Sequence, residues 1–165
     1  MKDEQLSINF RLSEFGYVRP TDQLLYILQY IRTESGCSVR ISSGPREVSD
    51  HVRIYKDLEK QGKIKTVGNG LGKENLIDII PWASRHLPTH AKEGEKTGLH
   101  AVDIVVKCPI NGLLTGLQIE KFIHRCIETD KYKEKFNAYL GVGIGHYYSH
   151  IDTGRTKPAR WGYPY

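Results

Sequence analysis

The sequence has no long hydrophobic run and contains little cysteine. A membrane-spanning helix needs ~20 predominantly apolar residues, and no stretch of this 165-residue chain approaches that length. The N-terminal segment MKDEQLSINF lacks the apolar core that a secretory signal peptide requires. We therefore expect a protein that is made in the cytoplasm and does not insert into a membrane.

Cysteine occurs at three scattered positions, Cys37, Cys108 and Cys126, and forms no C-x-x-C pair. An odd number without paired spacing predicts neither a disulfide framework nor a cysteine zinc site. Cys126 falls on the apolar face of a predicted helix, which favours a small buried core residue. Internal repeats and low-complexity linkers are also missing, so residues 1–165 are predicted to form one domain.

The chain carries a net charge of +5 and has a pI near 9.0. A basic surface favours polyanionic partners such as nucleic acid, anionic lipid or the acidic polymers of a bacterial wall. The lysines are mixed with acidic residues, a pattern typical of solvated faces. Because no tight basic cluster with interleaved aromatics occurs, the sequence predicts no nucleic-acid partner.

Apolar periodicity predicts both helices and strands. Helices are expected over 22–35, from Asp50 to about Gln61, and from Thr115 onward. Strands are expected over 38–42 and 101–107, and AYLGVGIG and YYSHID form two adjacent strands near the end. This order favours an α+β fold with a mainly antiparallel sheet packed against helices.

The segment SRHLPTHAKEGEKTGLHAVDI, residues 84–104, concentrates His86, His90, His100 and Asp103. Asp103 lies on a predicted strand within an apolar run, where a lone buried charge is very costly. It therefore needs either a cation or an arginine partner, such as Arg46 or Arg85. Pro88 argues against a helix that would direct His86 and His90 at the same ion.

The segment YYSHIDTGR holds a second histidine and a carboxylate. Side chains alternate along a strand, so His150 and Asp152 are expected on the same face. A histidine ligand beside a carboxylate suits zinc-dependent hydrolysis, in which the metal acidifies a water molecule and the carboxylate accepts its proton. His146 lies ~13 Å earlier along such a strand, too far away to share the ion.

Four short motifs follow one another along the chain: NFRLSEF (9–15), ISSGPR (41–46), SRHL with GLHAVDI (84–87 and 98–104), and GVGIG…SHIDTG…ARW, which ends at Trp161. In this order they resemble motifs of the zinc peptidases of the D-Ala-D-Ala carboxypeptidase and L-Ala-D-Glu endopeptidase family. That family cuts peptidoglycan stem peptides, and its fold is related to the hedgehog signalling domain. The resemblance covers most of the chain and implies the same fold here.

Carried over to this chain, the resemblance implies that His86, Asp103 and His150 bind Zn²⁺. It implies that Arg46 steadies the substrate carboxylate or the developing oxyanion, a role suited to an always-charged guanidinium. Ser84 would support substrate binding by hydrogen bonding. Asp152 is the candidate general base, with the alternative that it only orients His150.

The chain departs from the family pattern in two places. Sixteen residues separate His86 from Asp103, more than the family normally has, so PTHAKEGEK is interpreted as an inserted surface loop. This insertion leaves His90 and His100 as rivals for the first ligand position, with His86 favoured by the match of SRHL. The second departure is Tyr147, which stands three residues before His150, where many members have an acid. Glu14 is a distant alternative base.

The leading hypothesis is thus a zinc-dependent metallopeptidase that acts on peptidoglycan at the cell wall, with a phage endolysin as one form of it. The alternative is a non-catalytic relative that binds the wall or serves a structural role and keeps the fold. Tyr147 in place of the family's acid is the feature that favours this alternative.

Overall fold

The computed structural model describes residues 2–62, 86 and 98–163. Its first long helix, α1 (Asp22–Ser35), has the predicted bounds. The Thr21 hydroxyl accepts a hydrogen bond from the backbone N–H of Leu24, which satisfies a free donor of the first turn. Gly36 ends the helix in the left-handed region at φ 65°, where glycine is favoured.

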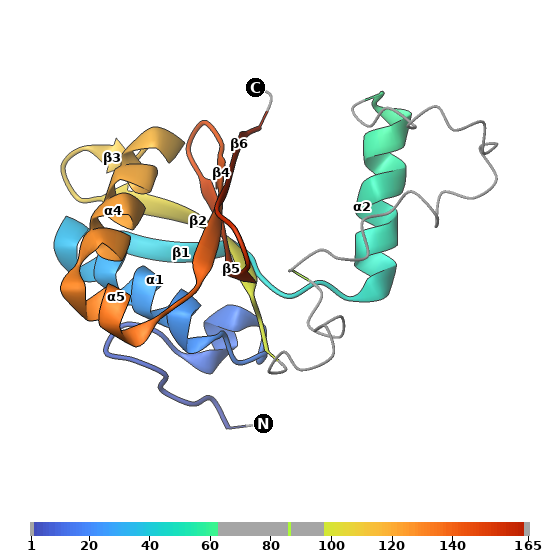
Figure 1. Ribbon diagram of the computed structural model, residues 1–165. Coiled ribbons are helices and arrows are strands. Elements are labelled where there is room, and N and C mark those ends of the chain that lie inside the picture. The colour runs from blue at the N-terminus through green and yellow to red at the C-terminus, as the bar shows by residue number, and fades with distance from the viewer. Residues whose placement is uncertain (1, 63–85, 87–97, 164–165) are drawn as a thin grey trace.

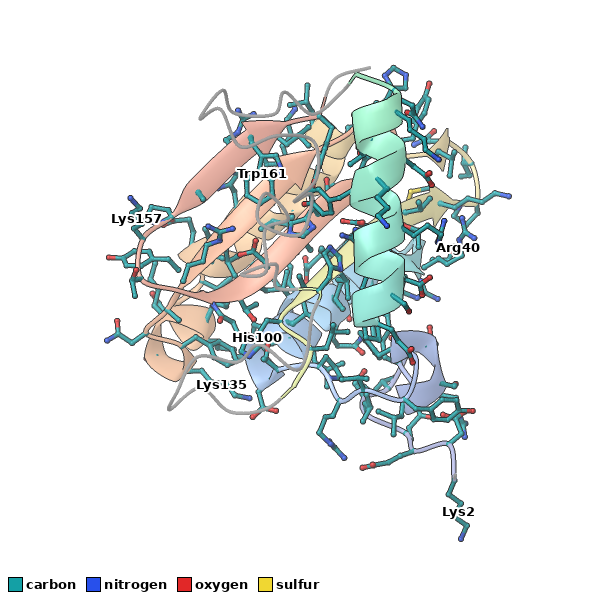
Figure 2. The ribbon with its side chains drawn as sticks, turned by 90° about the vertical axis from the view of Figure 1, so that its right-hand side faces the viewer. Lys2, Arg40, His100, Lys135, Lys157 and Trp161 are labelled. Carbon is teal, nitrogen blue, oxygen red and sulfur yellow. A yellow bond between two sulfur atoms is a disulfide. The ribbon has the colours of Figure 1, made fainter. Side chains whose placement is uncertain are left out.

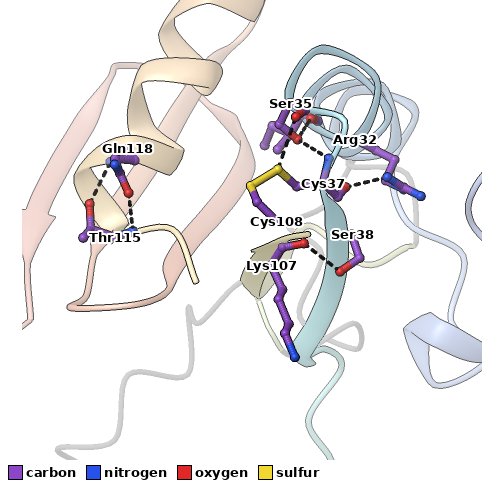
Figure 3. The surroundings of a disulfide bond; sticks show 9 residues. Arg32, Ser35, Cys37, Ser38, Lys107, Cys108, Thr115 and Gln118 are labelled. Carbon is purple, nitrogen blue, oxygen red and sulfur yellow. Dashed lines mark hydrogen bonds between the residues drawn. A yellow bond between two sulfur atoms is a disulfide. The ribbon is translucent and has the colours of Figure 1, made fainter. Parts of the chain in front are cut away.

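The other described helices are the 3-10 turn η1 (Leu12–Phe15), α2 (Val48–Lys60), α4 (Gly116–Glu128) and α5 (Asp130–Lys135). Helix α4 follows Thr115 as predicted, and a capping box between Thr115 and Gln118 fixes its start (Figure 3). Helix α2 begins two residues before the predicted Asp50. The short helix α5 was not predicted.

The strands are β1 (Ser38–Ser43), β2 (Ala101–Cys108), β3 (Gly112–Leu113), β4 (Tyr139–Ile144), β5 (Ser149–Arg155) and β6 (Ala159–Gly162). They form one sheet in the order β1-β2-β5-β4-β6, with β3 paired to β2. The pairings are antiparallel except for β4 with β6, which is parallel. The predicted α+β class with a mainly antiparallel sheet is therefore confirmed.

The two faces of the sheet differ in character. Helices α1, α4 and α5 cover one face, and α2 stands on the other side (Figure 1). On the helix-covered face, Val102, Ile104 and Val106 of β2 are fully buried together with α1 and α4 residues. Asp103 points to the opposite face, because side chains alternate along β2. The hydrophobic core and the polar residues of β2 thus lie on opposite sides of one sheet.

A disulfide joins Cys37 to Cys108, which contradicts the expectation that no disulfide would form (Figure 3). Antiparallel β1–β2 pairing aligns Ser38 with Lys107, so the two cysteines lie across from each other with Cα atoms 4.4 Å apart. This register links positions 71 residues apart, which spacing along the chain does not reveal. Cys126 is the free, buried thiol among the described cysteines, as expected.

None of the described helices is long and apolar enough to cross a membrane.

Candidate metal centre

The candidate site lies on the face of the sheet that α1 and α4 leave uncovered, the face viewed in Figure 2. A row of paired residues crosses the strands here. Asp103 of β2 pairs with His150 of β5, His150 pairs with Gly143 of β4, and Gly143 pairs with Trp161 of β6. The sheet register therefore brings a carboxylate, an imidazole and an indole side by side from distant parts of the chain.

The third ligand candidate, His86, is attached to the turn that follows β1. Its carbonyl oxygen accepts a hydrogen bond from the backbone N–H of Arg46 at 2.8 Å. Its Nδ1 lies 2.9 Å from the carbonyl oxygen of Gly44. The segment between β1 and α2 thus holds both the backbone and the ring of His86. The buried imidazole of His86 lies against the face of the sheet.

His86, Asp103 and His150 form a compact group whose ligand atoms all lie within 4.8 Å of one another. His150 Nδ1 is 2.8 Å from Asp103 Oδ1 and 3.1 Å from His86 Nε2. His86 Nε2 is 3.7 Å from the same Asp103 oxygen. Both histidines are buried, and Asp103 is partly buried. This group could hold a metal ion.

Each histidine makes a hydrogen bond through the ring nitrogen that is turned away from the group. These bonds determine whether the other ring nitrogen carries a proton or a lone pair. The carbonyl oxygen of Gly44 only accepts, so His86 Nδ1 must donate to it. The Asp152 carboxylate accepts likewise from His150 Nε2, at 3.1 Å. In neutral rings, His86 Nε2 and His150 Nδ1 therefore present lone pairs toward each other and toward Asp103. Three such electron-pair donors need a proton or a cation between them.

The pKa values of the three side chains are shifted in different directions. Burial lowers the pKa of His86 to about 4, although the charge of Asp103 opposes that shift. Burial also acts to lower the pKa of His150, but hydrogen bonds to Asp103 and Asp152 outweigh it and raise the pKa. Burial acts to raise the pKa of Asp103, yet the His150 hydrogen bond and nearby positive charges lower it. Of the two histidines, His150 therefore keeps a second proton to the higher pH.

The donor set also fits a catalytic metal. Two neutral imidazoles and one carboxylate are a ligand combination found in catalytic zinc sites, where three protein ligands leave a further coordination position open. A hydrogen bond from the second nitrogen of each histidine, as His86 and His150 make here, is the usual way such ligands are oriented.

Asp152, predicted as a general base, lies on the same face as His150, as strand alternation requires. It contacts His150 through Nε2, the nitrogen turned away from Asp103 and His86. Its carboxylate is buried and is also bound by the guanidinium of Arg155. This geometry favours the alternative that Asp152 orients His150, and the general-base role stays a prediction.

Arg46 is half-buried, and its backbone N–H donates a hydrogen bond to the carbonyl oxygen of His86. Its positive charge makes the smallest of the contributions that lower the pKa of Asp103. His100 precedes β2 and is not a member of the group. Glu14 caps η1 by accepting a hydrogen bond from the backbone N–H of Arg11. Ser84 and His90 lie outside the described residues.

Sequence reasoning missed the glycines of β4 and its following turn, Gly141, Gly143 and Gly145. A Cβ on Gly141 would lie 2.6 Å from Asp152 Oδ1, and one on Gly143 would lie 2.7 Å from Trp161 Nε1. Such distances leave no room for a side chain. Glycine at every second position, GVGIG, was the available signal, because glycine within a strand often marks a close approach by another group.

An aromatic group borders the cluster on the β6 side. The ring centroid of Trp161 is 5.2 Å from that of His150, and Trp161 also contacts Tyr163. Burial raises the pKa of Tyr163 to about 12, so this phenol stays neutral at physiological pH. Tyr147, by contrast, is exposed and makes an edge-to-face contact with the ring of His146. Neither Tyr147 nor His146 belongs to the metal-binding group.

A cavity of about 600 Å³ lies on the opposite, helix-covered side, between α4, α5, β4 and β6. Its apolar lining includes Ile123, Ile127, Phe136, Leu140 and Val142. The sheet separates this cavity from the metal-binding group, because Leu140 and Val142 alternate with the site-facing glycines of β4. We therefore place the candidate functional site at His86, Asp103 and His150 and not in this cavity.

Comparison of the chain with models of protein families, with curated proteins and with solved structures finds no match.

Proposed function

We propose that the protein is a zinc-dependent metallopeptidase that hydrolyses amide bonds in the stem peptides or crosslinks of peptidoglycan. The observation that carries the proposal is the convergence of His86, Asp103 and His150 at one point on the sheet face. The order of the four sequence motifs supports the peptidoglycan substrate. The same motifs support a fold of the D-Ala-D-Ala peptidase and hedgehog type for this α+β chain.

The ligand set leaves room for substrate. His86, Asp103 and His150 would hold the ion, and a set of three protein ligands is the number that catalytic zinc sites use when they also bind water or substrate. When bound, a zinc ion supplies Lewis acidity for amide hydrolysis. Hydrogen bonds to Gly44 and Asp152 hold His86 and His150 in place, which reduces reorganisation during the reaction.

Arg46 would stabilise negative charge on the substrate. It follows the turn that holds His86, and its charge already acts on Asp103. A guanidinium in this position can bind a terminal carboxylate or an oxyanion that develops during hydrolysis. The net charge of +5 adds a general attraction to anionic wall polymers. The cell wall is accordingly the proposed place of action, with a phage endolysin as one candidate role.

The test combines metal analysis with digestion of purified peptidoglycan, read by mass spectrometry of the released peptides. We expect about one zinc per chain and cleavage that a chelator abolishes. His86→Ala, Asp103→Ala and His150→Ala should each lose the metal and the activity. His124→Ala is the matched control, because this histidine is exposed on α4 and pairs with Glu120. Loss of zinc from the control alone would contradict the assignment.

The second candidate function is a non-catalytic wall-binding or structural protein of the same fold. The observation that favours it is Tyr147, an exposed tyrosine where many members of the resembled family have an acid. This alternative predicts zinc binding and retention on insoluble peptidoglycan without release of any peptide. The digestion experiment therefore distinguishes the two functions directly.

A further inference from the structure

Arg155 is connected to the metal-binding group through one buried carboxylate. The side chain of Asp152 is only 3% exposed. Arg155 Nη2 donates to Asp152 Oδ2 at 2.6 Å, and Arg155 Nε donates to the other oxygen. The same Oδ2 accepts from His150 Nε2 at 3.1 Å. A forked arginine contact of this kind fixes both the position and the rotation of a carboxylate.

A local departure from regular strand geometry makes this contact. Asp152 pairs with Gly141, whereas Arg155 pairs with Tyr139, so β5 has one residue more than β4 between these pairs. In a regular strand, residues 152 and 155 would point to opposite faces. The extra residue of this bulge returns Arg155 to the face of Asp152. Gly154 has φ 74°, a conformation that favours glycine and occurs in such bulges.

Neighbouring strands also accommodate Arg155. Its guanidinium carbon lies 5.4 Å from the ring centroid of Trp161, within the range of a cation–π contact. A Cβ on Gly141 would meet both Asp152 and Arg155 Nε. Trp161 also contacts the ring of His150, and the two ring centroids are 5.2 Å apart. Arg155, Asp152, His150 and Trp161 thus form one packed unit.

We propose that Arg155 is a positioning residue of the metal centre: it fixes the Asp152 carboxylate, which holds His150 as the Nε2–H tautomer with Nδ1 turned toward Asp103 and His86. The inference rests on the metal-binding part of the proposed function and not on peptide hydrolysis. Arg155 binds both carboxylate oxygens of Asp152. The role of Asp152 in this arrangement is to orient His150.

The first measurement is the zinc dissociation constant, obtained by competition with a chromophoric chelator. Arg155→Ala should weaken zinc binding by about 10- to 100-fold, the usual effect of removing an outer partner of a metal ligand. Arg155→Lys should recover part of this loss, because lysine restores the charge without the fork. The matched control is Arg160→Ala. Arg160 makes a similar forked contact to Glu120 of α4 at 2.5 and 3.1 Å, away from the metal-binding group, and its loss should leave zinc binding unchanged.

A double-mutant cycle tests whether Arg155 acts through Asp152. In an Asp152→Ala background, Arg155→Ala should cause little further loss of zinc affinity, because the intermediary is already gone. A fold weakened for general reasons would instead give two independent losses. If Arg155→Ala does not fold, the same cycle with Arg155→Gln decides the question, since glutamine is uncharged but keeps most of the side-chain volume.

A readout without metal or activity is the tautomer of His150, measured by ¹⁵N NMR at alkaline pH where the ring is neutral. Because the Asp103 carboxylate competes for a proton at Nδ1, the test is the change between variants: the fraction of Nε2–H should be lower in Arg155→Ala than in the unaltered protein. An unchanged zinc dissociation constant together with an unchanged tautomer would overturn the inference. Failure of the protein to cleave peptidoglycan would overturn the proposed function only, because neither readout of the positioning role involves hydrolysis.

Discussion

His150 stands between two carboxylates, one at each ring nitrogen. Nδ1 is 2.8 Å from Asp103 Oδ1, and Nε2 is 3.1 Å from Asp152 Oδ2. Burial alone would lower the pKa of His150, but these two contacts raise it above the ordinary value of 6.5. The ring therefore keeps its second proton to a higher pH than a free histidine does. A metal ion must displace that proton, because imidazole binds metals through a lone pair.

Zinc affinity should accordingly increase with pH. Below the raised pKa of His150, each zinc ion displaces one proton, so we expect the logarithm of the dissociation constant to fall by about one per pH unit. Above that pKa the ring is already neutral and the dependence should level off. His86, with a pKa of about 4, adds no dependence near neutrality. Calorimetry in two buffers of different ionisation enthalpy counts the released protons, and a count of zero at pH 6.5 would contradict this reasoning.

The residues that the fold brings together carried local signals in the sequence. Asp103 interrupts an apolar run, and His150 alternates with Asp152 on a strand. Asp103 was expected to need a cation or an arginine, and it lies in a group that could hold a metal ion, while the charge of Arg46 contributes to lowering its pKa. Arg155 gave no such signal. Strand alternation assigns it to the opposite face, and the bulge at Gly154 that reverses this assignment depends on pairing with β4.

At the scale of elements, strand β4 supports the aromatic border of the site, Trp161 and Tyr163. Its site-facing positions carry no side chain, so Trp161 and Tyr163 lie directly on the strand backbone at Gly143. The opposite face of the same strand contributes Leu140, Val142 and Ile144 to the core. The strand therefore separates the close-packed core from the face that holds the candidate site, and glycine at position 143 lets the aromatic rings approach its backbone.

Gly143→Ala should destabilise the protein by about 1–3 kcal/mol, the usual cost of overpacking. The new methyl group would lie 2.7 Å from both Trp161 Nε1 and Tyr163 Cε2 and would displace these rings. The matched control is Gly162→Ala on β6, where an added Cβ meets nothing within 4 Å. Urea unfolding of both variants checks the prediction. Equal stability of the two would show that the aromatic border yields without cost.

The disulfide between Cys37 and Cys108 closes a loop that contains Arg46, His86 and Asp103, with a sequence separation of 71 residues. It joins the start of β1 to the end of β2, near the hydrogen bond from Ser38 Oγ to the carbonyl oxygen of Lys107. Constraining so long a loop reduces the entropy of the unfolded chain. The disulfide should therefore stabilise the part of the chain that supplies two of the three candidate ligands.

Reduction, or Cys37→Ser with Cys108→Ser, should lower the free energy of unfolding by roughly 4 kcal/mol on the loop-entropy model. Denaturant melts with and without a reductant measure the change. Cys126→Ala is the control: its buried thiol forms no disulfide, so the variant should remain sensitive to the reductant. A double-serine variant that still responds to the reductant would show that another bond is responsible.

Elements with strong local signals were predictable, whereas those defined by tertiary pairing were not. Thr21 and Gly36 delimit α1, and Thr115 starts α4, because caps act within one turn. Strand β6 has four residues and pairs in parallel with β4, which requires a connection that short apolar patterns do not reveal. The disulfide depends in the same way on the register of β1 with β2.

At the scale of the whole molecule, the two faces of the sheet carry different kinds of residue. The helix-covered face contains the hydrophobic core, and the opposite face gathers His86, Asp103 and His150. Asp103 and His150 come from β2 and β5, and His86 is hydrogen-bonded to the segment that follows β1. An ion at this point would therefore connect three parts of the fold that no single local element holds together, including a histidine flanked on both sides by residues outside the described part of the chain.

Zinc should consequently raise the stability of the entire domain. Ligand that binds only the folded state at about 1,000 times its dissociation constant adds about 4 kcal/mol, which for a domain of this size corresponds to a Tm increase of roughly 10 °C. Thermal unfolding with zinc and then with excess chelator measures the difference. In Asp103→Ala the metal-dependent part should disappear, whereas His124→Ala should retain it, since His124 contacts Glu120 on the far side of the sheet. An equal increase in Tm in Asp103→Ala would mean that zinc stabilises the protein by binding elsewhere. The group on the sheet face would then not be the metal centre.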